Sequence, residues 1–213
     1  MADWVTISAL ATAGGTLVLA GATFASVRSA NRAARVAEQS MLVGLRPLLM
    51  PSRLDDAPQK IGFADSKWLV APGGGGAAEA TDGAVYLGFA VRNAGSGIAV
   101  LHGWHLRPSG DVVASDTHAP LEEFHTLTRD LYIPSRDVGF WQGALRDPSM
   151  PDFATARAAI EGRERMIIDV LYGDHEGGQR VVTRFTMTPR GDEDGGWIVG
   201  AARHWNIDRA DPR

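Results

Sequence analysis

The first 44 residues show one long apolar run followed by a more polar stretch that keeps the character of a helix. From Trp4 to Val27 no side chain is charged, and as an α-helix these 24 residues span about 36 Å, enough to cross a hydrocarbon core of ~30 Å. The stretch from Ser29 to Gly44 contains no proline and is rich in helix formers, and Pro47 follows as a stop signal. We therefore predict a transmembrane and juxtamembrane helix over residues 1–44.

The charges around the run predict its orientation in a membrane. Asp3 is the only charged side chain before it, whereas a cleavable signal peptide has a positive N-terminal region. Arginines follow it, so the positive-inside rule places the N-terminus outside the cell and the C-terminal domain in the cytoplasm. We expect a single-pass anchor in the plasma membrane, with the lipid bilayer as a partner. A buried core helix is the alternative, because Ala, Gly, Thr and Ser make the run only moderately apolar.

Several side chains have a defined role in this anchor. Tryptophan belongs at the outer interface, large apolar side chains supply most of the insertion energy, and arginines meet anionic headgroups. Small residues at Ala11, Gly15 and Ala22 form a stripe that permits close helix approach, so a homo-oligomer or a partner contact through the helix is a further option. The predicted anchor residues are Trp4, Leu10, Gly15, Leu17, Leu19, Phe24, Arg28, Arg32 and Arg35.

Beyond Gly44 the pattern changes from helical to alternating, as in half-buried strands. We predict about eight strands, in the segments 46–54, 85–93, 97–106, 129–133, 138–145, 165–173, 180–189 and 196–205. The turns 134–137 and 174–179 are expected to close two hairpins. One short helix is expected at Pro151–Gly162, since proline suits a first turn and glycine a helix end. The glycine-rich segment Ala71–Gly83 is interpreted as a flexible loop.

This series of short strands favours an antiparallel β-sandwich over a βαβ sheet. The predicted fold is mainly β. A transmembrane helix is followed, over residues 45–213, by an immunoglobulin-like β-sandwich that contains one short inserted helix. The amino-acid composition excludes several classes of functional site. Cysteine is absent, which excludes disulfides, zinc-thiolate sites and thiol nucleophiles. The net charge is −4, so the chain has no basic footprint for nucleic acid. No cofactor is expected.

The most distinctive internal motif is RNAGSGIAV, Arg92 to Val100. Asn93, Gly95 and Gly97 follow one alternating strand and open another, which is typical of a tight turn. The motif resembles the Asn-x-Gly-x-Gly-x-Ala turn of membrane-tethered immunoglobulin-like domains of bacteria. A phosphate-binding loop is the functional alternative, but no Gly-Lys-Ser/Thr follows. We therefore favour a structural turn.

Six histidines raise the question of a metal or catalytic site. His102 and His105 are three residues apart on a strand and are expected on opposite faces, where they cannot easily share an ion. No metal is predicted at any of the six. A cluster able to build an open three-ligand site on a loop consists of Asp116, His118, Glu122, Glu123 and His125, although such clusters are more often solvated. No Gly-x-Ser-x-Gly motif is present, and catalytic residues stay unknown.

Four tryptophans, Trp104, Trp141, Trp197 and Trp205, are expected to fill the core, and Trp205 to dock on the sandwich. In the alternative interpretation Trp141 and Trp205 are exposed and form a binding surface with His175, which lies in the hairpin turn DHEGGQ. A polar hairpin tip is the simpler account of His175.

The whole chain resembles a set of uncharacterised single-pass proteins from high-GC Gram-positive bacteria that have an immunoglobulin-like β-sandwich domain. The resemblance rests on "WVTISALATAGGTLVLAGATFASVRSANRAARVAEQS", "LRPLLMPSR", "NAGSGIAVLHGW", "FWQGALRD", "LYGDHEGGQR" and "RHWNIDRADPR". It covers nearly the full length and implies an anchor followed by a sandwich, with no catalytic residue to carry over.

The function that follows is a membrane-tethered cytoplasmic interaction or sensing module that recruits a protein partner. Exposed loops and aromatic side chains suffice for binding, and no catalytic constellation is apparent. One alternative is an accessory subunit of a larger membrane complex. Another is a membrane-bound hydrolase that uses the region of His118, Glu122, Glu123 and His125; the gathering of these side chains in one pocket would favour it, and their scatter would favour the interaction module.

Overall fold

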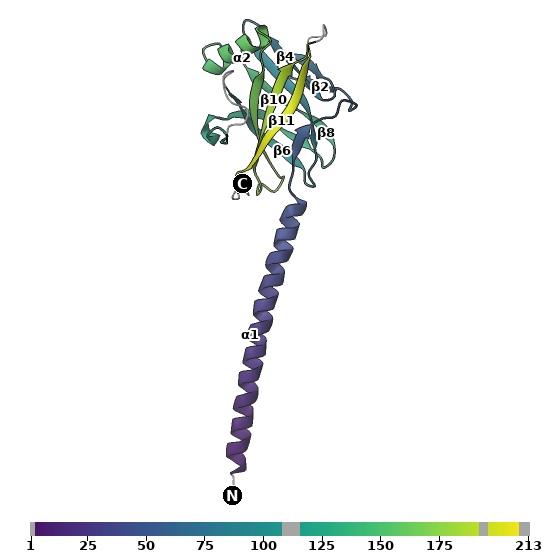
Figure 1. Cartoon of the computed structure of the whole chain (residues 1–213). Helices are drawn as coiled ribbons and strands as arrows, with labels where there is room; N and C mark the ends of the chain where they lie inside the picture. The colour runs from purple at the N-terminus through teal and green to yellow at the C-terminus, as the bar shows by residue number, and fades with distance from the viewer. Residues whose placement is uncertain (1–2, 108–115, 192–195, 209–213) are drawn as a thin grey trace. The chain divides into compact units, whose positions relative to one another are not determined.

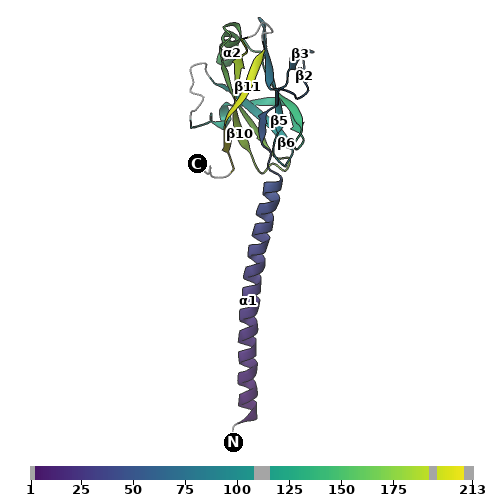
Figure 2. The ribbon, with the colours of Figure 1, turned by 45° about the vertical axis from the view of Figure 1, so that its right-hand side comes forward.

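The computed structural model describes residues 3–107, 116–191 and 196–208 (Figure 1). The chain divides into two compact units that meet between Gly44 and Leu45. The first unit is a helix and the second a body rich in β-strands (Figure 2). The protein is thus mainly β, with a long N-terminal apolar helix.

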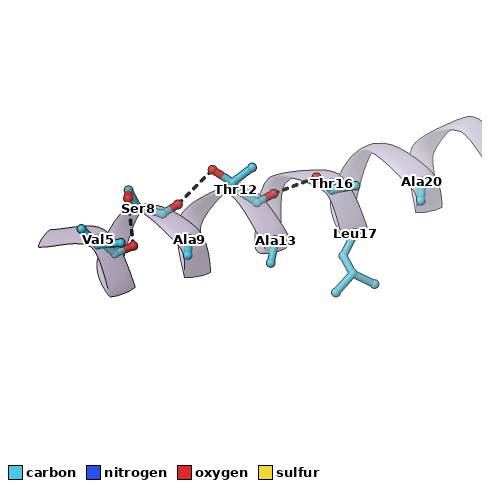
Figure 3. Close-up of a pocket in the computed structure, with 8 residues that line it drawn as sticks. All are labelled: Val5, Ser8, Ala9, Thr12, Ala13, Thr16, Leu17 and Ala20. Carbon is cyan, nitrogen blue, oxygen red and sulfur yellow. Dashed lines mark hydrogen bonds between the residues drawn. The ribbon is translucent and has the colours of Figure 1, made fainter. Parts of the chain in front are cut away.

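The first unit is one uninterrupted helix, α1 (Trp4–Gly44). Its alanine content and lack of proline favour this conformation. Figure 3 shows how Ser8, Thr12 and Thr16 donate hydrogen bonds to backbone carbonyl oxygens three or four residues earlier, at 2.8–2.9 Å, which satisfies these hydroxyls within the helix. The helix is long and apolar enough to cross a membrane, and its apolar window has no part buried in the protein. The structure therefore gives no support to the alternative of a buried core helix.

The β-rich body contains eleven strands and two short helices within its described residues. In chain order they are β1 (Leu49–Pro51), β2 (Gln59–Gly62), β3 (Trp68–Ala71), β4 (Gly75–Ala80), β5 (Val85–Asn93), β6 (Ala99–Arg107), the 3₁₀ turn η1 (Leu121–Glu123), β7 (His125–Ile133), β8 (Val138–Leu145), α2 (Pro151–Glu161), β9 (Met166–Gly173), β10 (Val181–Pro189) and β11 (Trp197–Asn206).

Nine of these strands form one antiparallel sheet with the order β1-β5-β4-β11-β10-β9-β6-β7, and β8 pairs with β5. The expected hairpin of β9 and β10 is confirmed, with Tyr172 opposite Val181. Apolar side chains from both ends of the sheet, including Leu87, Leu101 and Phe185, belong to one buried cluster. The sheet therefore curves around a single core, into which α2 also packs through Phe153.

The separate β2–β3 hairpin covers part of the outer surface of the sheet. Ile61, Phe63 and Leu69 pack with Tyr86 of β5 and with Phe140 of β8 in a second, smaller apolar cluster. Two strands joined by a turn are marginal by themselves in water. This cluster fixes the hairpin to the body, and Figure 2 shows both strands beside β5.

Three expectations for the strands of the body are wrong. The segment Ala71–Gly83 contains strand β4, paired with β5 and β11, rather than a flexible loop. Its glycines are required by packing: a Cβ on Gly76 would lie 2.9 Å from the carbonyl oxygen of Gly88. The second error concerns β7 and β8, which follow each other across the turn 134–137 but form no ladder, because β7 pairs with β6 and β8 with β5. The prediction of about eight strands also missed β2, β3 and β4.

The motif at Asn93 is a structural turn, as expected. The buried amide of Asn93 donates to the carbonyl oxygens of Gly97 (2.7 Å) and Ile133 (3.0 Å) and accepts from the backbone N–H groups of Leu48 (3.1 Å) and Gly95 (3.0 Å). One side chain thereby joins the chain leading into β1, the β5–β6 turn and the end of β7. A side chain cannot be accommodated at Gly97, because a Cβ there would overlap the carbonyl of Leu45.

Candidate functional site

The predicted anchor residues all lie on the exposed surface of α1. Trp4, Leu10, Leu17, Leu19 and Phe24 are at least two-thirds exposed. A Cβ on Gly15 would meet no atom within 4 Å, so a second helix can approach there. Three further anchor residues share a shallow groove just after the apolar run, whose lining consists of Phe24, Val27, Arg28, Asn31, Arg32 and Arg35.

The acidic and histidine side chains of segment 116–125 do not gather at one point. Nδ1 of His118 lies 2.6 Å from its neighbouring carbonyl oxygen, and its ring packs edge-on against Trp205. His125 instead pairs with Asp152 at 2.8 Å, and Glu123 lies 3.6 Å from His105. Within the described residues, no group of three or more His, Asp and Glu side chains is arranged to hold a metal ion. The four side chains therefore do not share one pocket.

The expectation that His102 and His105 lie on opposite faces of β6 is wrong. The register of β6 shifts between Leu101 and Gly103, which is the mark of a β-bulge. Leu101 and Trp104 both belong to the core, so the alternation changes phase between them. The two histidines consequently fall on the same, outer side of the strand. Burial lowers the pKa of each below its usual value, and nearby carboxylates only partly oppose this effect.

A row of ionisable side chains crosses four neighbouring strands on this outer side. His105 of β6 is opposite Asp169 of β9, which is opposite Arg184 of β10, which is opposite Arg203 of β11. The indole ring of Trp205 lies 4.7 Å from the Arg184 guanidinium and 5.5 Å from that of Arg203. These contacts are cation–π interactions.

Residues 116–124, here named the strap, cover this row. Asp116 pairs with Arg203, and its carbonyl oxygen accepts a hydrogen bond from Nε1 of Trp205 at 3.0 Å. The carbonyl oxygen of Thr117 accepts from Arg184 at 3.0 Å. The row is therefore a structural element that holds the strap, because its charges are engaged inside the protein.

The tryptophans that sequence reasoning offered as exposed anchors are buried. Trp141 is 0% exposed and stacks on Phe89 at 4.7 Å, and Trp205 is 6% exposed under the strap. Their indoles remove large apolar areas from water, which explains their position. The exposed-anchor interpretation is thus wrong for both, and the expected docking of Trp205 on the body is confirmed.

His175 lies in the exposed tip of the β9–β10 hairpin, 3.3 Å from Glu176. The tip is shaped by Asp174, a buried carboxylate that accepts hydrogen bonds from the N–H of Gly178 and from the Gln179 side chain. Gly177 adopts a φ of +79°, which favours glycine. These contacts account for the sequence of the tip as a polar turn.

The sequence interpretation did not single out Trp68. Trp68 is 65% exposed and Val70 56%, both on the outer face of the β2–β3 hairpin. A Cβ on Gly62, which is opposite Trp68, would lie 2.9 Å from the indole ring, so the ring rests flat on the strand backbone. Lys60 is opposite Val70, and the second lysine of the chain, Lys67, precedes Trp68. We call Lys60, Gly62, Trp68 and Val70 the hairpin face.

The signal for this face was present in the sequence. In KWLV the positions alternate, and Leu69 packs inward while Trp68 and Val70 point out. A tryptophan on the outward side of an amphipathic strand is uncommon, so this face is a candidate interaction surface.

Comparison with known proteins does not assign the chain to a family. No model of a protein family matches the chain, and no curated protein is significantly similar to it. The resemblance to uncharacterised single-pass proteins stays a prediction.

Proposed function

We propose that this chain is a membrane-tethered interaction module, anchored by α1 and binding a protein partner through the hairpin face. The observation that carries the proposal is the exposure of Trp68. It is 65% exposed, whereas the other four tryptophans of the body are at most 6% exposed. A protein stabilises its fold by burying indoles, so one left outside beside an exposed valine is suited to burial against another surface.

The geometry of the hairpin face supports this role. The indole ring lies flat against Gly62 and is pre-organised, so binding costs little side-chain entropy. Burial of a tryptophan together with Val70 supplies the apolar centre of an interface, and Lys60 supplies a charged rim. The complementary partner surface is an apolar pocket with acidic residues at its edge.

The location of the module follows from the anchor. Arg28, Arg32 and Arg35 after the apolar run favour an N-terminus outside the cell and a cytoplasmic body. Within this proposal the body is an immunoglobulin-like domain; its antiparallel sheet supports that classification, which stays a prediction. The helix serves to hold the hairpin face near the inner leaflet, where a membrane-bound partner is concentrated.

A photo-crosslinking experiment tests the proposed interface. A photoreactive phenylalanine analogue replaces Trp68 in full-length protein expressed in its native membrane, and replaces Tyr132 in the control. Tyr132 is also strongly exposed but lies on β7. We expect a discrete crosslinked product from position 68, lost on addition of Val70→Asp, and none from position 132. Equal crosslinking from both positions, or none from position 68, contradicts the proposal.

Orientation has its own test, made simple by the absence of cysteine. Single cysteines are introduced as Asp3→Cys and Asp208→Cys, and intact cells are treated with a maleimide that cannot cross membranes. We expect labelling of the first variant only, with both labelled after lysis. Labelling of Asp208→Cys on intact cells overturns the cytoplasmic assignment.

Helix pairing is a second candidate, favoured by the surface of α1. A shallow groove runs along the face shown in Figure 3, lined by Val5, Ser8, Ala9, Thr12, Ala13, Thr16, Leu17 and Ala20. At about 100° per residue this face is centred about 130° around the helix from the stripe of Ala11, Gly15 and Ala22. In a crosslinking assay in membranes, Ala13→Leu reduces pairing through the groove, and Gly15→Leu reduces pairing through the stripe. Unchanged pairing in both variants excludes the helix as the contact.

A further inference from the structure

The curved sheet stays open along one line, between β7 and β8. These strands are joined by the turn 134–137 but do not pair with each other, because β7 pairs with β6 and β8 pairs with β5. Between them lies a cavity of about 170 Å³, lined by Ala64, Trp104, His125, Thr126, Leu127, Thr128, Gln142, Gly143, Ala144 and Arg146. We call it the seam cavity.

The packing below the cavity keeps the strands apart. A Cβ on Gly143 would lie 2.8 Å from the ring of Trp141 and 2.9 Å from that of Trp104, so two indoles fill the space beneath β8. On the other side of the cavity, the four residues of β7 between Thr126 and Leu131 lie opposite a single residue of β6, His102. This irregular pairing bends β7 outward. Both features are fixed by the core, so the cavity is part of the folded state.

The polar groups around the cavity are held in place by partners behind them. Asp152, in the first turn of α2 where a negative charge is favoured, holds His125 at 2.8 Å. Asp65 accepts a hydrogen bond from Nε of Arg146 at 3.1 Å. The carbonyl oxygen of the Gln142 side chain accepts from Arg129 at 3.0 Å, which leaves the amide N–H groups of Gln142 as donors.

The balance of these groups selects the charge of a ligand. Arg146 keeps its terminal guanidinium N–H groups, Gln142 offers its amide N–H groups, and two threonines offer hydroxyls, so donors predominate. The nearby carboxylates, Asp65 and Asp152, are each engaged by a basic side chain. A ligand with acceptor oxygens and a negative charge fits this arrangement, as does a flat apolar part against the edge of Trp104. A cavity of ~150 Å³ is enough for a benzene ring.

We propose that the seam cavity binds a small organic carboxylate, whose carboxylate oxygens accept hydrogen bonds from Arg146 and Gln142 and whose apolar part lies against Trp104. The site is separate from the hairpin face and gives the module a small molecule to sense. Its volume of about 170 Å³ suits one ligand of the size of a substituted benzoate.

The test uses full-length protein in lipid nanodiscs, with 4-fluorobenzoate as the probe and 4-fluorobenzamide as its neutral counterpart. Binding is followed by the fluorine NMR linewidth of the probe, with empty nanodiscs as the blank. We expect saturable binding of the carboxylate and at least tenfold weaker binding of the amide, because a charge-assisted hydrogen bond is lost.

Variants assign the binding to the cavity. Arg146→Gln is expected to weaken carboxylate binding at least tenfold, and Ala64→Trp, at an exposed rim position, to block it. Arg157→Gln serves as the matched control, since this arginine also pairs with carboxylates but lies on α2 away from the lining. Trp68→Ala changes the hairpin face and not the cavity, so we expect it to leave probe binding unchanged while it abolishes partner binding.

Three results would overturn the proposal: no saturation with the carboxylate below about 10 mM, equal affinity for the amide, or undiminished binding by both Arg146→Gln and Ala64→Trp. Thermal melting of each variant shows whether the fold is retained. Because Ala64 is exposed, a loss of binding in Ala64→Trp with an unchanged melting temperature is attributed to the cavity itself.

Discussion

Arg184 and Asp169 form a two-bond salt bridge in which neither side chain is accessible to solvent. Nε of Arg184 donates to Oδ1 of Asp169 at 2.7 Å and the terminal nitrogen Nη2 donates to Oδ2 at 2.9 Å. Arg107 lies 3.6 Å from the same carboxylate. Desolvation of two charges is costly, and the geometry of the pair offsets that cost only while both partners are present.

Removal of one partner is therefore expected to be severe. Asp169→Ala leaves the Arg184 guanidinium buried without its counter-charge, and we expect a loss of about 3–5 kcal/mol in the free energy of unfolding. The double variant Asp169→Leu, Arg184→Leu should lose much less than the sum of the two single changes. Urea unfolding of the body, followed by circular dichroism, measures both.

The exposed pair of Arg180 and Asp208 provides the control. Asp208→Asn should cost less than ~1 kcal/mol, because solvent screens an exposed pair. A small loss in Asp169→Ala, similar to that of Asp208→Asn, would show that the buried pair does not stabilise the body in the way described.

Asn93 provides a second prediction, since its amide makes four hydrogen bonds to three segments of backbone. Asn93→Ala leaves two N–H groups and two carbonyl oxygens without this partner, and we expect a loss of about 3 kcal/mol or more in unfolding free energy. Asn93→Asp keeps the two accepted bonds but turns a negative charge towards the carbonyl oxygens of Gly97 and Ile133. It should be least stable near neutral pH and partly recover on acidification, as seen in the same urea experiment; a variant as stable as wild type at all pH values would contradict this role.

The sequence predicted well those elements whose own residues determine them. The helix through Gly44 and the strands around Val85–Asn93 carry their period in the sequence, so they could be found without tertiary information. Strand β4 could not, because Gly75 and Gly76 indicate a loop locally and are explained only by the neighbouring strands that approach them.

The candidate sites were harder to predict for the same reason. The phase of His102 and His105 depends on a bulge in β6, and a bulge is a property of strand pairing rather than of composition. The open line between β7 and β8 is accompanied by two indoles, Trp104 and Trp141, packed beneath Gly143, and Trp104 comes from β6, a strand that the local turn signal does not include. By contrast, the exposed Trp68 follows from simple alternation and could have been recognised.

The stability of the body should fall between pH 7 and pH 5. Burial lowers the pKa of His105 and of His102, while Asp152, Asp169 and Glu123 raise that of His105 and only partly oppose the effect. Because the folded-state pKa lies below the unfolded value of about 6.5, the unfolded chain binds the proton more readily. The stabilising contribution is present above about pH 6.5 and is lost as pH falls towards the folded-state pKa.

Chemical unfolding at a series of pH values tests this pH dependence. We expect His105→Gln to flatten the curve between pH 5 and pH 7, and the double change with His102→Gln to flatten it further. Asp65 does not interfere in this window, because the Tyr86 hydroxyl and then Arg146 lower its pKa to about 2. A slope that is the same in wild type and in the double variant would assign the pH dependence to other groups.

The anchor is testable at the centre of its apolar run. Leu17 is 74% exposed on α1. Leu17→Arg places a charge near the middle of the bilayer at a cost of about 3–4 kcal/mol relative to leucine. We expect this variant to be released from membranes by alkaline carbonate, whereas wild type stays in the pellet. Val36→Arg is the matched control, since Val36 is also exposed but follows the arginines and lies outside the span. Retention of Leu17→Arg in the pellet, or release of Val36→Arg to the same extent, would mean that residues 4–27 do not cross the bilayer.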